Sequence, residues 1–564
     1  MSCLSGGFGA GGVLILFGRM KNRAGEEADF CGRICLPFRG FVCLNVGMKK
    51  FLLCVLICFA FSAEYLFCAD SLQFVDSLEI EPESYAVKVE GFDFGAAAVA
   101  LILNLGRTVI APSVKAEDFE VSVFTRSAKS ESSRIKIKGK RKVNEAYISD
   151  ESGKPSEEKM SRYITLKLSV SPDDELCSPF TGSKLPFFST ESVFGYRIRN
   201  DKLKFTIQKS SGIICPQVAR FKSDRHTSGE VTISYFSWKP EAKREGDFSS
   251  QSVPDDFFPL PDSADSFDAD FSDQSSPDSK NARGGDEEKI PLLIWFHGMG
   301  ESGSNPYLAL LGIKAAALIE EEVQSHFKNG CAVLIPQCPT GWLETTETDF
   351  TGHRIWAPVD IQGTANKIAS PITGFFNNFF YKDKNTSIEP NEAVSYYTAA
   401  VKDLIDRYIR ENPDVDTKRI YIGGCSAGGY MVINMLFQFP KMFAAAIPVC
   451  EVYPDSRISH ANIEKIRTIP MWFVAAKTDE TVSPEKYTFA LVDRLKTAGA
   501  ENMRATILDS VRDTTGMFFD PEDDSDSPAP YEYAGHWSWI YVFNDDIFDG
   551  DLNLFDWLAS CRLK

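Results

Sequence analysis

Short runs of alternating apolar and polar residues fill the chain from about residue 70 to residue 240. Alternation with a period of two is typical of β-strands that bury one face, and turn residues separate the runs. This pattern predicts an all-β sandwich over residues 70–240. Its expected strands include Tyr85–Val89, Ala98–Leu103, Phe119–Phe124, Tyr163–Val170 and Val231–Phe236.

From residue 290 the pattern changes to short apolar strands that alternate with helical segments. This order predicts an α/β domain over residues 290–564, in which helices cover both faces of a mostly parallel sheet. Because residues 337–391 form a long insertion between a strand and a helix, we expect a lid or a substrate wall there. The strands are expected at 291–296, 332–335, 420–423, 443–449, 471–475 and 504–508. The helices are expected at 307–323, 392–411, 430–437, 484–498 and 552–559.

Residues 241–289 join the two regions and are rich in Ser, Asp and Pro. They hold 14 acidic and 5 basic side chains, which is half of the net charge of −18 of the whole chain. Their phenylalanines are isolated, so we expect a disordered acidic linker. A chain this acidic is not expected to bind nucleic acid.

Two lysines and an apolar run follow Met48, and small residues follow the run. This order predicts a secretory signal over residues 48–69, so residues 1–47 are expected to lie upstream of the true start. The prediction is a secreted or periplasmic protein without a membrane segment in its mature chain. A lipid anchor at Cys68 and a single membrane anchor are alternatives. Seven cysteines follow the signal, so at least one is unpaired, and Cys331 and Cys338 are near enough in sequence to form a disulfide.

The segment Gly424-Cys425-Ser426-Ala427-Gly428 is a G-x-S-x-G motif between an apolar strand and a helix. Small residues two positions before and after the serine allow a very tight turn, which exposes the hydroxyl at the start of a helix. We therefore expect Ser426 to be a nucleophile. The alternative is a glycine-rich turn without chemistry.

A serine nucleophile needs a base, and His536 is the only histidine after the last expected strand. His353 and His460 are weaker alternatives, His226 is assigned to the sandwich, and His326 is expected to be exposed. The acid that orients the base should follow the strand 471–475, where Asp479 stands. Its fallbacks are Glu480 and Glu451.

The oxyanion hole is expected after the strand 291–296, in the glycine-rich segment 297–303. The Met299 and Ala427 amides are the predicted donors, and His297 is expected to support this loop. The segment also spells G-x-G-x-x-G, but a dinucleotide site would leave the Ser, His and Asp candidates unexplained. No cofactor is expected. The histidines are scattered, so no metal is expected either.

These motifs resemble secreted α/β-hydrolase esterases of the prolyl-oligopeptidase-like and polyhydroxybutyrate-depolymerase-like group, which carry an N-terminal immunoglobulin-like domain. The resemblance rests on PLLIWFHGMGESG (291–303), VLIPQCP (333–339), IYIGGCSAGGYM (420–431), AKTDETV (476–482) and GHWSW (535–539). It implies Ser426, Asp479 and His536 as the triad, and ester substrates such as acyl or feruloyl esters of polysaccharides.

The sequence therefore predicts a serine esterase that acts on a small-molecule or polysaccharide-linked ester. A serine peptidase and a non-catalytic surface-binding protein are the alternatives. Three tryptophans are candidate substrate contacts. Trp342 and Trp356 lie in the insertion, where they either line an acyl or aryl pocket or pack the insertion onto the sheet, and Trp537 follows His536. The sequence does not predict the oligomeric state.

Overall fold

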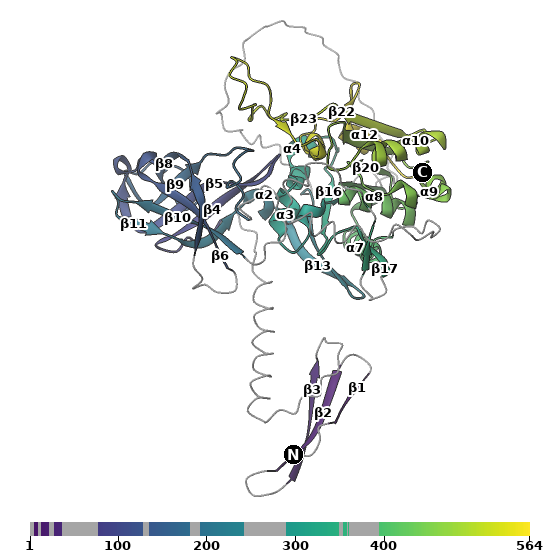
Figure 1. Cartoon of the computed structure of the whole chain (residues 1–564), viewed down its shortest axis with the longest axis horizontal. Helices are drawn as coiled ribbons and strands as arrows, with labels where there is room; N and C mark the ends of the chain where they lie inside the picture. Colours follow the sequence, from purple (N-terminus) through teal and green to yellow (C-terminus); the bar gives the residue numbers. More distant parts are fainter. Residues whose placement is uncertain are drawn as a thin grey trace, which may run out of the picture. The chain divides into compact units, whose positions relative to one another are not determined.

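The computed structural model describes residues 77–127, 135–180, 192–241, 289–348, 354–357, 359 and 394–564, together with the backbone of three strands near the N-terminus. The chain divides into two compact units, Met1–Leu72 and Gln73–Lys564 (Figure 1). The described strands of the first unit form an antiparallel sheet in the order β1 (Ser5–Gly9), β2 (Val13–Lys21) and β3 (Glu27–Cys35). The predicted start and signal at 48–69, nearly all of the predicted linker, and residues 360–393 of the insertion lie outside the described residues.

Residues 77–214 form a sandwich of two sheets, here called the β-sandwich domain. One sheet has the strand order β11-β10-β6-β7 and the other β12-β4-β5-β9-β8. Neighbouring strands pair antiparallel, except for β12 and β4, which are parallel. The strands are β4 (Ser84–Phe92), β5 (Gly95–Ile110), β6 (Glu120–Ser127), β7 (Lys136–Arg141), β8 (Val143–Ser149), β9 (Met160–Leu168), β10 (Ser192–Asn200), β11 (Phe205–Ile207) and β12 (Lys209–Ile214). The predicted all-β sandwich is confirmed.

The rest of the second unit, residues 216–564, is here called the α/β domain. Its main sheet has the order β13-β14-β16-β15-β19-β20-β21-β22. The last six strands in this order are parallel to one another, as predicted. The strands are β13 (Lys222–Ser228), β14 (Val231–Trp238), β15 (Ile290–Phe296), β16 (Ala332–Gln337), β19 (Val415–Cys425), β20 (Ala445–Val449), β21 (Met471–Ala476) and β22 (Met503–Leu508).

The hairpin β13–β14 differs from the sequence prediction, which placed its residues in the sandwich. β14 pairs antiparallel with β16, so the hairpin extends the sheet of the α/β domain. Alternation along β14 predicts a half-buried strand but carries no information on which sheet will receive it. The boundary between the domains therefore lies near residue 215 rather than at the predicted residue 240.

Helices and short turns surround the sheet (Figure 1). The helices are α2 (Pro216–Ala219), α3 (Pro306–Leu311), α4 (Glu321–Gln324), α7 (Thr398–Glu411), α8 (Ala427–Gln438), α9 (His460–Ile466), α10 (Ala490–Thr497), α11 (Trp539–Phe543) and α12 (Leu554–Ser560). Shorter helical turns include η3 (Met299–Glu301), η4 (Ala315–Ile319), η6 (Glu485–Phe489) and η7 (Gly535–Trp537). In the described part of the insertion, β17 (Glu344–Thr348) pairs with β18 (Arg354–Trp356).

The helix expected over residues 307–323 is broken into α3, η4 and α4. Gly312 ends the first segment, and Lys314 adopts a left-handed conformation with φ of +63°. A Cβ atom at Gly312 would lie only 2.6 Å from the carbonyl oxygen of Leu308 and 2.9 Å from Cγ of Glu301. The left-handed Lys314 interrupts the helical hydrogen bonds, and the close packing requires glycine at position 312; a helical pattern reveals neither feature.

Alternate residues of the central strands feed two cores, one on each face of the sheet. From β15, Leu292 and Ile294 join the core beneath α7 and α8. Leu293 and Trp295 join the opposite core, which continues without a break into the interior of the β-sandwich domain. The two domains therefore share a hydrophobic core. None of the helices in the described ranges combines the length and the apolar character that a membrane crossing requires.

Candidate active site

The G-x-S-x-G motif forms a sharp turn between β19 and α8. Ser426 stands between them with φ of +55° and ψ of −118°, a conformation that residues with a side chain rarely adopt. Its amide donates to the carbonyl of Val449 at 3.0 Å, which fixes the turn to β20. This hydrogen bond thus stabilises the strained conformation, which holds the hydroxyl at the end of the sheet.

The glycines of this motif are required by close backbone packing. A Cβ atom at Gly428 would lie 2.1 Å from the carbonyl oxygen of Phe296, and one at Gly424 would lie 2.8 Å from the same oxygen. Both positions therefore exclude a side chain. Because these glycines lack one, the start of α8 packs directly against the end of β15, where residues 297–303 begin.

Ser426, His536 and Asp479 form one hydrogen-bonded chain. The Ser426 hydroxyl oxygen is 3.0 Å from His536 Nε2, and His536 Nδ1 is 2.8 Å from Asp479 Oδ2. The other Asp479 oxygen accepts the amides of Thr481 at 2.9 Å and Val482 at 2.8 Å. The structure thus brings together the three residues selected from the sequence, in the arrangement that activates a serine hydroxyl.

The loops that carry His536 and Asp479 are in direct contact. A Cβ atom at Gly535 would lie 2.2 Å from the carbonyl carbon of Thr478 and 2.6 Å from the amide nitrogen of Asp479. Asp479 is buried and His536 is partly buried. Because both ends of the His536–Asp479 hydrogen bond are held by packed backbone, the imidazole has a defined orientation.

The two predicted oxyanion donors lie beside the serine. Ala427 is the first residue of α8, and Met299 opens η3 in residues 297–303, here called the oxyanion loop. A Cβ atom at Gly298 would lie 3.8 Å from Cβ of Ser426, so this loop borders the nucleophile. Neither amide donates a hydrogen bond to another described residue. Such amides can receive a negatively charged oxygen.

His297 supports the oxyanion loop from within the core. Its Nδ1 lies 2.6 Å from the carbonyl oxygen of Gly298, and its Nε2 accepts the amide of Cys338 at 2.9 Å. Burial lowers its pKa to about 4, so the ring is neutral at neutral pH. This agrees with the supporting role expected from the sequence.

Glu301 is a buried carboxyl group of the oxyanion loop that the sequence prediction missed. Burial raises its pKa to about 7, and the neighbouring backbone of Glu301 and Gly298 only partly offsets this effect. Gln337 also donates to the backbone carbonyl of Glu301 at 2.8 Å. The available signal was a charged residue inside a glycine-rich loop directly after a fully buried strand.

The three candidate tryptophans have different surroundings. Trp342 was expected to contact substrate, but it is fully buried, and its Nε1 donates to the carbonyl of His297 at 3.1 Å. It therefore braces the oxyanion loop, which agrees with the packing alternative for Trp342 rather than with a substrate contact. Trp356 is half-buried. A Cβ atom at Gly341 would lie 2.7 Å from the Trp356 ring and 2.8 Å from Met299 Sδ, so Trp356 and Met299 lie near each other.

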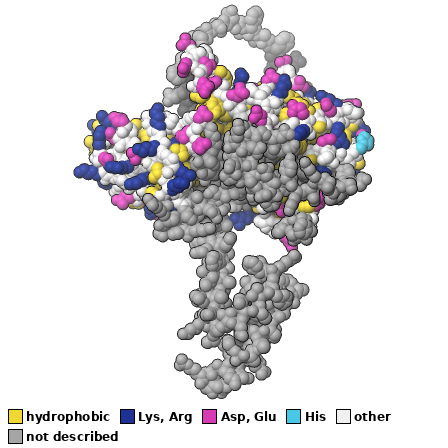
Figure 2. All heavy atoms as spheres, viewed as in Figure 1, with side chains coloured by type: hydrophobic (Ala, Val, Ile, Leu, Met, Phe, Trp, Pro, Cys, Tyr) yellow, Lys and Arg dark blue, Asp and Glu magenta, His cyan; other side chains and the backbone are white. Residues whose placement is uncertain are grey.

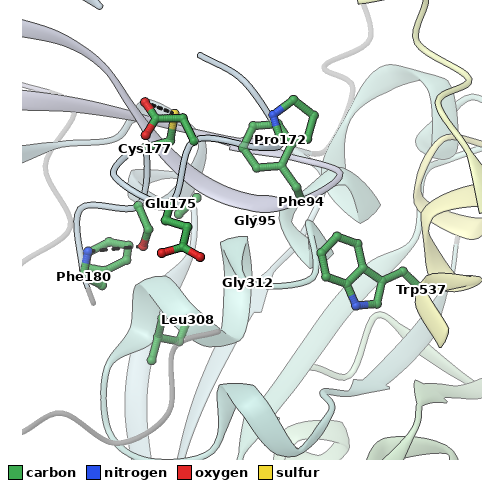
Figure 3. Close-up of a pocket in the computed structure, with 12 residues that line it drawn as sticks. Phe94, Gly95, Pro172, Glu175, Cys177, Phe180, Leu308, Gly312 and Trp537 are labelled. Atoms are coloured by element: carbon green, nitrogen blue, oxygen red, sulfur yellow. Dashed lines mark hydrogen bonds between the residues drawn. The ribbon is translucent and has the colours of Figure 1, made fainter. Parts of the chain in front are cut away.

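Trp537, the third candidate, is half-buried directly after His536. It lines a cavity whose other lining residues come from both domains (Figure 3). Phe94, Pro172 and Phe180 come from the β-sandwich domain, whereas Leu308 and Gly312 come from the α/β domain. Trp537 thus connects the residue after His536 with a cavity between the two domains.

The remaining histidines lie away from the serine. His226 belongs to β13 of the α/β domain rather than to the sandwich, and its Nε2 lies 3.0 Å from Asp403. His326 was expected to be exposed, but it lies 2.8 Å from both Asp545 and Asp556. His460 is an exposed residue at the start of α9, and His353 is outside the described residues.

The fallback acids are also placed away from the imidazole. Glu480 is exposed, and Glu451 is fully buried with Oε2 accepting the amide of Tyr453 at 2.7 Å. Burial raises the pKa of Glu451 to about 8. Within the described ranges, no group of His, Cys, Asp and Glu side chains is arranged to hold a metal ion.

The seven cysteines from Cys177 to Cys561 are free and buried. Cys331 and Cys338, the suggested disulfide pair, flank the extended strand β16. An extended strand advances about 3.3 Å per residue, so their separation in sequence keeps the two sulfur atoms apart. Short sequence spacing was therefore misleading for this pair.

Comparisons with known proteins match this architecture. Residues 84–216 match the family model described as the esterase Ig-like N-terminal domain, and residues 398–454 match the prolyl oligopeptidase family. The chain is a serine hydrolase with an esterase Ig-like N-terminal domain. No protein with a curated description matches the sequence.

Solved structures resemble this serine hydrolase to different extents. The crystal structure of a thermostable esterase is 19% identical, with a TM-score of 0.50 over 85% of this chain and 99% of that chain. This likeness supports the combined fold of both domains. An acylaminoacyl peptidase from Pyrococcus horikoshii (13% identity, TM-score 0.26, 51% of this chain and 36% of that one) resembles a smaller part. So does SOBER1 from Arabidopsis thaliana (20% identity, TM-score 0.25, 39% and 88%).

Proposed function

We propose that this serine hydrolase cleaves carboxylic esters through an acyl-enzyme on Ser426. The observation that carries the proposal is the hydrogen-bonded chain from Ser426 through His536 to Asp479, with distances of 3.0 and 2.8 Å. This chain begins on a strained turn at a helix start, beside the two backbone amides of Met299 and Ala427. Acyl transfer requires a nucleophile, a base, an orienting acid and oxyanion donors.

In the proposed reaction, His536 Nε2 accepts the hydroxyl proton of Ser426 as the oxygen attacks the ester carbonyl carbon. The carbonyl oxygen becomes an anion that the Met299 and Ala427 amides stabilise. The bond to the alcohol oxygen breaks, and His536 returns its proton to that oxygen. A water molecule, deprotonated by His536, then attacks the acyl carbon and releases the acid and free Ser426.

The role proposed for Asp479 is to hold one tautomer of His536. Its Oδ2 accepts the Nδ1 proton, which leaves Nε2 as the acceptor for the serine proton. The same carboxylate stabilises the imidazolium that forms during each proton transfer. The two backbone amides on Oδ1 fix the carboxylate for this task.

Ester substrates are favoured by the match of residues 84–216 to an esterase domain. On the basis of the sequence resemblance, the proposal extends to feruloyl or other acyl esters of polysaccharides as substrates. It also extends to a secreted or periplasmic location of the protein. A peptidase is the second candidate, because residues 398–454 match the prolyl oligopeptidase family. The same triad can cleave an amide when the leaving amine is protonated by the histidine.

A substrate series tests the proposal. Wild type and Ser426→Ala are compared on chromogenic esters from acetyl to octanoyl, on a feruloyl ester, and on a p-nitroanilide peptide. Serine-dependent ester cleavage with an inert peptide is the expected result. Preferential peptide cleavage would favour the peptidase, and an active, correctly folded Ser426→Ala variant would refute the role of the serine.

A further inference from the structure

The turn between β4 and β5 carries a buried carboxylate from the β-sandwich domain onto the α/β domain. The Asp93 side chain is only 1% exposed. Lys314 Nζ donates to one carboxylate oxygen at 2.8 Å, and Asn544 Nδ2 donates to the other at 3.0 Å. A buried charge is costly unless it is paired and hydrogen-bonded, so Asp93 depends on these two partners.

The two partners of Asp93 are also bonded to each other. Lys314 Nζ donates to Asn544 Oδ1 at 2.5 Å, which closes a triangle of hydrogen bonds. The triangle joins three segments that are far apart in the sequence. Because two of its bonds start from a charged ammonium group and two end on a carboxylate, they are stronger than hydrogen bonds between neutral groups.

One arm of the triangle leads to the oxyanion loop. Lys314 has a left-handed conformation and lies two residues after Gly312. The backbone at Gly312 packs so closely on Glu301 that a Cβ atom would lie 2.9 Å from Glu301 Cγ. The Glu301 carboxyl group in turn packs against Gly298, the neighbour of Met299, where a Cβ atom would lie 3.0 Å from Glu301 Oε2. Displacement of Lys314 would therefore reach the oxyanion loop through packed atoms.

The other arm leads to His536. Asn544 caps the C-terminal end of α11, and its amide donates to the carbonyl of Ile540 at 2.9 Å. α11 begins at Trp539, whose ring lies edge-on to the His536 ring with centroids 5.6 Å apart. Asn544 Nδ2 also donates to Thr514 at 2.9 Å. The asparagine thus connects Asp93 with the short helix that follows the histidine.

The same turn forms one wall of the cavity beside Trp537 (Figure 3). Phe94 stacks on Phe92 with centroids 5.4 Å apart, and Phe518 contacts both rings edge-on. These aromatic contacts and the shared core restrict how the turn can move. The turn is therefore a firm anchor for the polar triangle.

We propose that Asp93 is a positioning residue of the active site. Through Lys314 and Asn544 it holds the oxyanion loop and the His536 loop in their reactive arrangement, from outside the domain that contains the triad. The β-sandwich domain is then part of the active-site framework. This inference rests on the proposed function only for the choice of an ester as substrate.

The test compares Asp93→Asn and Asp93→Glu with wild type in the full chain. Both kcat and KM are measured with a chromogenic ester, and the rate at which a fluorophosphonate labels Ser426 is measured in parallel. We expect kcat and the labelling rate to fall about 10- to 100-fold, because small misplacements of catalytic groups have such effects. KM is expected to change less than about threefold, since a loss confined to the transition state lowers kcat.

Asp173→Asn is the matched control. Asp173 also belongs to the β-sandwich domain and accepts a hydrogen bond from Tyr531 of the α/β domain at 2.8 Å, but at an exposed position. This variant is expected to react at the wild-type rate. If it slows as much as the Asp93 variants, the effect belongs to domain contact in general and the proposal is overturned.

Other outcomes are equally decisive. A folded Asp93→Asn variant with the kcat and labelling rate of wild type would overturn the proposal. If this variant does not fold, Asp93→Glu decides, because it keeps the charge and displaces the carboxylate. If neither folds, the triangle serves folding and the positioning role is rejected. A wild type that is labelled but cleaves no ester would refute the ester proposal alone, since the labelling comparison still applies.

Discussion

At the scale of single residues, carboxyl groups near the nucleophile do different work because their surroundings differ. Asp479 accepts from two backbone amides and lies 2.8 Å from Nδ1 of His536. Glu301 and Glu451 are buried with fewer donors, and burial raises their pKa to about 7 and about 8. Its hydrogen bonds enable the Asp479 carboxylate to orient the imidazole. Burial favours the protonated form of Glu301 and Glu451, which therefore have structural roles.

The role of Asp479 can be tested by Asp479→Asn. The amide keeps the shape of the carboxylate but does not enforce the same tautomer of His536, so we expect kcat to fall by about 10³- to 10⁴-fold. Steady-state kinetics with a chromogenic ester measures this loss. Glu480→Gln is the control, because Glu480 is adjacent and exposed. Equal activity of Asp479→Asn and wild type would exclude Asp479 as the orienting acid.

The buried carboxyl groups predict how stability depends on pH. In the folded protein the pKa values of Glu301 and Glu451 lie above the unfolded value near 4.5, so the native state keeps protons that the unfolded state releases. Their stabilisation is complete below pH 4.5 and is lost as the pH rises to about 8. For Glu301 the loss is on the order of 3 kcal/mol.

Denaturant unfolding between pH 4.5 and 9 measures this dependence. The double variant Glu301→Gln/Glu451→Gln is expected to show a flatter dependence of the free energy of unfolding on pH. Glu320→Gln, which removes a partly exposed partner of Arg220, is expected to leave the slope unchanged. An unchanged slope in the double variant would show that these two groups do not titrate as described.

At the scale of elements, the turn from β19 to α8 determines the geometry of the site. The helix can start beside β15 only because Gly428 has no side chain. We expect Gly428→Ala to destabilise the protein by more than about 3 kcal/mol, since the methyl group would overlap a backbone oxygen. Thermal unfolding measures the effect.

Gly300→Ala is the matched control for this prediction, because nothing lies within 4 Å of the added Cβ atom. Its stability is expected to change by less than about 1 kcal/mol. If both alanine variants unfold at the same temperature, close packing at Gly428 is not what fixes the turn.

Sequence patterns predicted most strands and helices of the sheet because each depends on local periodicity. Ser426, His536 and Asp479 could be selected as the triad from the sequence because each follows an expected strand of the sheet. Parallel strands end at the same edge, so residues that follow them can meet there. The position of β14 was predicted wrongly, and the sequence left open whether Trp342 packs or lines a pocket. Both depend on contacts with distant segments, which local patterns do not encode.

At the scale of the whole molecule, the two domains behave as one structural body in the second unit. The core of the β-sandwich domain continues into one core of the α/β domain. Lys and Arg side chains are numerous on the visible face of the β-sandwich domain (Figure 2). Lys138 and Lys140 of the edge strand β7 are exposed. Charged edges of this kind discourage pairing with other strands, so contact is directed to the apolar side.

The continuous core predicts cooperative unfolding. Because neither domain can lose its packing without exposing the shared core, differential scanning calorimetry is expected to show one transition for residues 77–564. Two separate transitions would show that the domains are energetically independent. The polar triangle at Asp93 could not be predicted from the sequence, since its three members become neighbours only in the folded chain.

The most direct test of the account is to trap the acyl-enzyme. The protein is mixed with a chromogenic acetyl ester, quenched in acid within the first turnover, digested and analysed by mass spectrometry. The account predicts one acetyl group on the peptide that contains Ser426, and none in Ser426→Ala or in wild type pretreated with a fluorophosphonate. Ester turnover without modification of Ser426, or with the acetyl group on another residue, would contradict it.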